Sequence, residues 1–143
     1  MKAKQSLTVI LILFLAQLAT AQDRQTSSNY ITLEESTKQQ IIEIEIVKEV
    51  DMLRIGLNTT LYNGIITAEI ISPNGELQGK FKAGVEGVLE YDKEGKEKIK
   101  EQSRLEKNVD NPETGVWKVK VITQKASGYL RVESKQYTEK ENK

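Results

Sequence analysis

The chain has 143 residues with 21 basic and 21 acidic side chains, and it contains neither cysteine nor histidine. The missing thiol and imidazole groups exclude serine–histidine or cysteine–histidine catalysis and a typical zinc site. The balanced charge argues against nucleic-acid binding, which needs a concentrated basic surface. We therefore expect one domain, without a cofactor and without enzymatic activity.

The first 21 residues predict a cleaved signal peptide. Lys2 and Lys4 form a basic start, residues 7–18 form an apolar run, and small residues precede a cleavage site after Ala21. The apolar run is shorter than the about 20 residues that cross a bilayer, so a retained membrane anchor is the less favoured alternative and no span is expected after cleavage. Since small secreted animal domains usually carry disulfides, the absence of cysteine favours a bacterial periplasmic or secreted protein.

Residues 22–37 are mostly polar and predict a flexible lead-in, with a short first strand at residues 30–33 as an option. From Gln40 onward isoleucines alternate with glutamates, and residues 53–57 show a second alternation of apolar and polar side chains. A period of two residues predicts strands that are buried on one face. The two runs form either a hairpin or a connection between sheets. The sequence does not assign Ile55 to the core or to the surface.

The dipeptide Asn63-Gly64 predicts a turn, because both residues tolerate a positive φ. A strand over residues 65–71 follows, with three inward side chains: Ile66, Ala68 and Ile70. The sequence SPNG at residues 72–75 predicts a second turn, in which proline presets φ and the last two residues accept unusual backbone angles. Residues 76–91 predict one or two short strands, whose expected anchors are Phe81, Val85, Leu89 and Tyr91.

Residues 92–108 are highly charged and predict an excursion that leads into a strand near residues 105–109, with a helix or a loop as alternatives. After Pro112 the alternation of residue types predicts a strand with lysines on its outer face. A turn at residues 124–128 and a last strand at residues 129–133 follow. The charged residues 135–143 predict a disordered tail.

Short strands separated by Gly, Pro and Asn turns predict an all-β fold, an antiparallel β-sandwich of the jelly-roll or immunoglobulin-like type with about seven to nine strands. The sandwich domain is expected over residues 38–134. The residues expected in its core are Ile42, Ile44, Ile66, Ile70, Trp117, Val119 and Val121.

Two segments carry a resemblance to a known class of module. Residues 63–75 end a strand in SPNG, and residues 111–121 read NPETGVWKVKV, continued by a turn and GYL at residues 128–130. This pattern resembles the bacterial pre-peptidase C-terminal domains and the proprotein convertase P-domain. The resemblance implies a jelly-roll-like sandwich, without catalysis, that assists folding, secretion or binding to surfaces and polymers.

Trp117 is the single tryptophan and has two interpretations, a platform for a sugar or peptide and a core anchor. Its parity matches Val119 and Val121, which favours the core. The oxygen-rich residues Asp110, Asn111 and Glu113 are a weak calcium candidate, because calcium prefers carboxylate and carbonyl oxygens. Capping of backbone amides by these side chains is the favoured alternative.

Glu43 and Glu45 are two carboxylates on one strand face, a residue type that glycoside hydrolysis uses in pairs. That chemistry needs carboxylates on facing elements, so we favour charge pairing of these glutamates with Lys118 and Lys120 across strands.

The sequence therefore predicts an exported, non-enzymatic module that binds or scaffolds a protein or a glycan at the cell envelope. The alternative is an accessory or inhibitor subunit of a secreted peptidase or glycosidase that uses residues 76–108 as its contact surface. An enzyme based on Glu43 and Glu45 is the third hypothesis.

Overall fold

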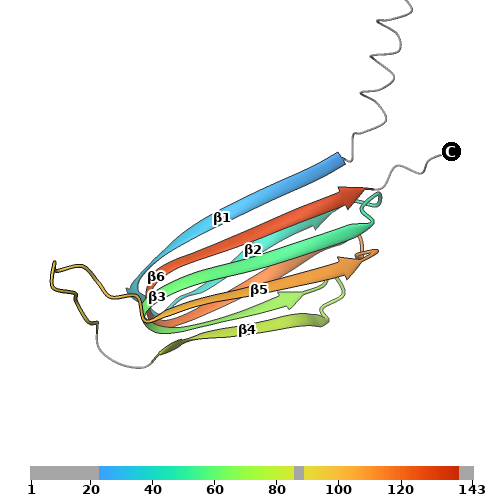
Figure 1. The fold of residues 1–143 in the computed structure, drawn as a ribbon. Helices are drawn as coiled ribbons and strands as arrows, with labels where there is room; N and C mark the ends of the chain where they lie inside the picture. The colour runs from blue at the N-terminus through green and yellow to red at the C-terminus, as the bar shows by residue number, and fades with distance from the viewer. Residues whose placement is uncertain (1–22, 86–88, 139–143) are drawn as a thin grey trace, which may run out of the picture.

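The computed structural model describes residues 23–85 and 89–138, and these residues form antiparallel strands without a helix (Figure 1). The strands are β1 (Asp23–Ser36), β2 (Gln39–Ile46), β3 (Met52–Ile71), β4 (Leu77–Val85), β5 (Glu101–Asp110) and β6 (Gly115–Thr138). The predicted all-β antiparallel sandwich is confirmed. The strands are fewer than predicted, because β3 and β6 are long enough to serve two layers. The predicted signal peptide, residues 1–21, and the end of the predicted tail lie outside the described residues.

A single sheet is doubled over to make both layers of the sandwich. The C-terminal half of β6 pairs with β1 and with the first half of β3, whose other neighbour is β5. We call these segments the long layer. The N-terminal half of β6 pairs with β2 and with the second half of β3, whose other neighbour is β4, and these segments form the short layer. Strands β3 and β6 therefore run through both layers (Figure 1).

The layers meet along a crease where β3 and β6 bend. In β3 the buried side chains are odd-numbered up to Asn63 and even-numbered from Ile66 onward, and the register with β6 shifts at this point. A change of face within one strand requires an extra residue, which is a β-bulge. Gly64 provides this residue, with φ 83°. Glycine is needed here because a Cβ would lie 2.3 Å from the carbonyl oxygen of Lys125.

The core lies between the layers and contains the alternating side chains of both. Ile55 is buried, and so are most of the expected core residues: Ile44, Ile66, Ile70, Trp117, Val119 and Val121. Ile42 is partly buried and packs at the margin of this cluster. Burial of apolar surface of this kind stabilises a fold by about 25 cal/mol per Å².

Two segments that the sequence predicts as turns are bends inside continuous strands. Asn63-Gly64 lies within β3, and residues 124–128 lie within β6. The turn predictions are wrong because a bulged bend and a hairpin turn both select residues that accept a positive φ. The connection from β2 to β3 crosses from the short layer to the long layer, so the hairpin alternative for these strands is also wrong.

Strand β1 occupies the segment that the sequence predicts as a flexible lead-in, residues 22–37, and β6 continues into the predicted tail as far as Thr138. The two ends pair with each other, from Asp23 opposite Thr138 onward. β1 is an edge strand, and most of its described side chains are exposed. Its polar composition therefore resembles that of a linker, although Ile31 and Leu33 pack on the core.

The SPNG segment at residues 72–75 forms the predicted turn, between β3 and β4. The amide of Gly75 donates to the carbonyl oxygen of Ser72 at 2.9 Å, and Gly75 has φ 89°. After β4 the chain leaves the sandwich and returns as β5, which starts at Glu101, earlier than the sequence predicts.

Candidate functional site: a tyrosine cleft at the crease

Three tyrosine rings gather on the outer face of the sandwich at the crease: Tyr30 of β1, Tyr62 of β3 and Tyr129 of β6. The ring centroids of Tyr30 and Tyr129 are 5.6 Å apart and the ring planes are tilted by 35°. The centroids of Tyr62 and Tyr129 are 6.0 Å apart in an edge-to-face arrangement. Tyr30 is 65% exposed and Tyr129 is 37% exposed, so the cluster offers aromatic surface to solvent.

The strand register brings these tyrosines together from distant parts of the chain. Tyr129 lies opposite Thr32 on one side and opposite Thr60 on the other. Tyr30 precedes Thr32 by two residues, and Tyr62 follows Thr60 by two residues. Side chains two residues apart on a strand share a face, so the rings become diagonal neighbours across the strands.

A cleft of about 460 Å³ opens beside Tyr62 and Tyr129. Binding sites for small ligands have volumes of about 300–1,000 Å³ and combine apolar walls with a few polar groups. The residues that line the cleft come from the end of β1, from the crease and from the segment after β4: Thr32, Leu33, Glu34, Glu35, Tyr62, Leu89, Tyr91, Glu97, Ser127, Gly128 and Tyr129.

The segment after β4 forms a hairpin that contributes one wall of the cleft. Tyr91 and Glu97 are bridged as antiparallel partners, and the amide of Lys98 donates to the carbonyl oxygen of Glu90 at 2.8 Å. At the tip, the carboxylate of Asp92 accepts hydrogen bonds from two backbone amides. The amide of Lys100 donates to the carbonyl oxygen of Leu61 at 2.8 Å, which fixes the base of the hairpin next to Tyr62.

The cleft carries negative charge. Its described lining residues include Glu34, Glu35 and Glu97 but no lysine or arginine. The ion pairs among residues 23–85 and 89–138 involve other carboxylates, such as Glu69 with Lys80. The carboxylates of the cleft are therefore available to a ligand.

The pKa of the Tyr62 phenol is raised above its ordinary value of 10.0. Burial is the largest cause, because a phenolate loses hydration there. A hydrogen bond with Tyr129 and the charge of Glu97 raise the pKa further. The hydroxyl of Tyr62 therefore stays protonated near neutral pH.

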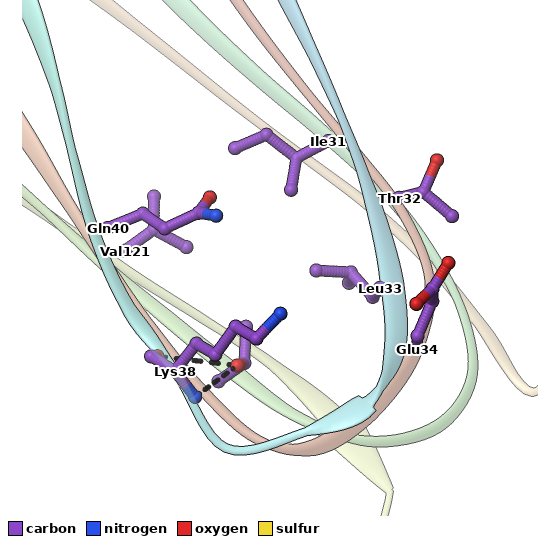
Figure 2. Close-up of a pocket in the computed structure, with 8 residues that line it drawn as sticks. Ile31, Thr32, Leu33, Glu34, Lys38, Gln40 and Val121 are labelled. Carbon is purple, nitrogen blue, oxygen red and sulfur yellow. Dashed lines mark hydrogen bonds between the residues drawn. The ribbon is translucent and has the colours of Figure 1, made fainter.

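A second, smaller hollow of about 40 Å³ lies on the other side of β1, between β1 and β2 (Figure 2). Ile31 and Leu33 point into it from β1, and the amine of Lys38 points into it from the connection between β1 and β2, whereas Thr32 and Glu34 point away. Its volume suits a water molecule or two rather than an organic ligand. The alternation along β1 therefore divides its side chains between this hollow and the tyrosine cleft.

The residues of the weak calcium candidate lie at the end of β5 and in the connection to β6. Asp110 ends β5, and Asn111 has φ 46° and donates its amide to the carbonyl oxygen of Asp51 at 2.7 Å. The carbonyl oxygen of Glu113 accepts the indole N–H of Trp117 at 2.9 Å. Within residues 23–85 and 89–138, no group of three or more acidic side chains is arranged to hold a metal ion.

The carboxylates proposed from the sequence for catalysis lie on the outer face of the short layer. In the register, Glu43 is opposite Lys118, whereas Glu45 is opposite Val116 and Lys120 is opposite Ile41. Neither Glu43 nor Glu45 lines the tyrosine cleft.

Sequence reasoning missed the tyrosine cluster. The outward parity of Tyr129 with Arg131 and Glu133 was visible, and it marks an aromatic ring on a solvated face. The positions of Tyr30 and Tyr62 beside it depend on the register of three strands, which the sequence does not specify.

The fold resembles several solved structures, at low similarity. A pilus protein of Bacillus endospore appendages is 14% identical with a TM-score of 0.48, over 82% of this chain and 88% of the other. The module CBM4 is 9% identical with a TM-score of 0.43, over 83% and 81%. The module TmCBM61, solved with β-1,4-galactotriose, is 16% identical with a TM-score of 0.41, over 82% and 89%.

No family model and no curated protein matches the chain. Membership in the pre-peptidase C-terminal or P-domain families is therefore not shown. In the part of the chain that the structure describes, no helix has the length and apolar character to cross a membrane.

Proposed function

We propose that the protein is an exported, non-enzymatic module that binds a glycan at the cell envelope through the tyrosine cleft. The observation that carries this proposal is the cluster of Tyr30, Tyr62 and Tyr129 at the edge of a ligand-sized cleft. Export rests on the signal peptide that the sequence predicts in residues 1–21.

The chemistry of the cleft matches the two sides of a sugar ring. The C–H faces of a pyranose are apolar and pack against aromatic rings, whereas its hydroxyl groups need hydrogen-bond partners. The rings of Tyr129 and Tyr30 supply the apolar surface, and the carboxylate of Glu34 supplies acceptors beside them. Because the rings lie on neighbouring strands of one sheet, they are positioned before a ligand arrives, which lowers the entropy cost of binding.

Co-sedimentation of the purified protein with cellulose, chitin, chitosan and peptidoglycan tests the proposal. We expect at least one of these polymers to retain the protein and Tyr129→Ala to abolish retention. Tyr137→Ala is the matched control, because Tyr137 lies on the same strand and the same face but outside the cleft lining. Full retention of Tyr129→Ala, or no retention of the wild type by any polymer, would contradict glycan binding in this cleft.

A second candidate function is an accessory or inhibitor subunit of a secreted hydrolase. The observation that favours it is the hairpin after β4, which projects from the crease end of the sandwich (Figure 1) and exposes Tyr91 by 57% and Ile99 by 54%. Since the chain has no cysteine, Ile99→Cys provides a unique attachment point for a cross-linker. Capture of a peptidase or glycosidase from that position, but not from Ile41→Cys on β2, which is outside residues 76–108 and 52% exposed, would favour this function.

A further inference from the structure

We propose that the tyrosine cleft selects glycans with free, protonated amino groups over neutral and acidic glycans. This inference rests on the proposed glycan-binding function and adds the class of sugar. It is carried by the combination of aromatic rings and carboxylates in a cleft whose described lining contains no basic side chain.

The wall formed by the hairpin combines the two groups that recognise an ammonium ion. Tyr91 and Glu97 are direct partners across the antiparallel bridge, so their side chains leave the same face of the hairpin. Aromatic rings attract cations through their negative faces, and a carboxylate adds charge-assisted hydrogen bonds. Both residues line the cleft, and Tyr91 is 57% exposed, so its ring is open to a ligand.

The opposite wall has the same character. Glu34 of β1 lies opposite Ser127 of β6. Ser127 is two residues before Tyr129, with Gly128 between them. Glu97 lines the cleft together with Tyr62. A sugar ring stacked on the tyrosines would therefore have carboxylates on the β1 side and on the hairpin side.

Two basic groups around the cleft, Arg131 and Lys38, do not line it. Arg131, on the outer face beside Tyr30, is engaged by the carboxylate of Glu133 and by the hydroxyl of Ser28. The amine of Lys38 lies in the small hollow, and the carboxylate of Glu34 lies on the other side of the β1 ribbon (Figure 2). An acidic glycan would consequently meet uncompensated negative charge, which costs binding free energy.

Calorimetric titration with three soluble oligosaccharides tests the inference: a glucosamine tetramer, an N-acetylglucosamine tetramer and a galacturonic acid tetramer. The titrations are run at about pH 6, where the sugar amino groups are protonated. We expect the glucosamine tetramer to bind at least tenfold more tightly than the acetylated tetramer, and the acidic tetramer not to bind. Glu97→Gln should weaken binding of the glucosamine tetramer about tenfold, the effect of losing one charge-assisted contact.

Glu94→Gln is the matched control, because Glu94 is on the same hairpin but pairs with Lys96 at 3.5 Å and does not line the cleft. Equal binding of the glucosamine and acetylated tetramers, or an unchanged affinity of Glu97→Gln, would overturn the selectivity. If Tyr129→Ala still abolished binding in that case, the proposed function would stand without it. Binding of all tetramers that survives Tyr129→Ala would instead overturn the proposed function, and preferential binding of a lysine-rich peptide would assign the cleft to a protein ligand.

Discussion

The ring of Tyr62 meets the ring of Tyr129 edge to face, with 6.0 Å between the centroids, and this contact joins β3 to β6 at the crease. Burial, followed by the hydrogen bond with Tyr129, raises the pKa of Tyr62 above 10.0. A raised pKa means that the folded state holds this proton more tightly than the unfolded state does. Its contribution to stability is therefore complete below pH 10 and is lost as the pH rises through the folded pKa.

Tyr62→Phe should remove this alkaline loss. We expect the free energy of unfolding of the wild type to fall more steeply above pH 10 than that of Tyr62→Phe, while the two differ by only about 1 kcal/mol at neutral pH, where one hydrogen bond is missing. Urea titrations over a series of pH values measure this difference. Parallel curves for the two proteins would show that Tyr62 titrates normally.

Gly128→Ala should destabilise the crease. Gly128 has φ 137°, and a Cβ would lie 2.0 Å from the carbonyl oxygen of Thr60, so the two strands would have to separate. We expect a loss of about 3 kcal/mol or more in thermal or urea unfolding. Gly95→Ala is the control, because Gly95 has φ 79° but a Cβ there would meet no atom within 4 Å, and only about 1 kcal/mol of backbone strain is expected. Equal losses for the two variants would contradict the close approach at the crease.

The fluorescence of Trp117 should show that the core excludes water. It is 2% exposed, and its indole N–H donates to the carbonyl oxygen of Glu113. We expect blue-shifted emission that acrylamide quenches poorly, and a loss of about 3–5 kcal/mol for Trp117→Ala, because the cavity cannot fully collapse. Val116→Ala on the exposed face of the same strand should change stability by only about 0.5 kcal/mol. Emission like that of tryptophan in water would place the ring outside the core.

Chelation should leave the stability unchanged. The carbonyl oxygen of Glu113 is already used by Trp117, and the described residues contain no acidic cluster for a metal ion. We therefore expect the same melting temperature with EDTA and with millimolar calcium. A melting temperature that rises with calcium and returns with EDTA would revive the site at Asp110, Asn111 and Glu113.

The sequence predicts the class of fold because each strand is buried on one face. The alternation around Ile44, Ile66 and Val119 is a local property that survives without knowledge of the partner strands. The doubling of the sheet is not local. Asn63-Gly64 carries the same backbone preference in a hairpin as in a bulged bend, so the sequence cannot tell whether the chain reverses there.

The candidate site was beyond sequence reasoning for a similar reason. Tyr30 and Tyr129 have ring centroids 5.6 Å apart in space but lie on strands from opposite ends of the chain. Their proximity depends on β1, whose polar composition resembles that of a linker because an edge strand buries few side chains. The carboxylates of the cleft likewise give no signal one by one, since glutamate is common throughout the chain.

Because β3 and β6 each belong to both layers, neither layer can detach while the other stays intact. Breaking one layer would pull on the same two backbones that hold the other, so we expect unfolding to be a single cooperative event. The tyrosines sit on β1, β3 and β6 where these backbones bend. A ligand that contacts all three tyrosines would connect the three strands, and its binding free energy would add to the stability of the whole fold by mass action.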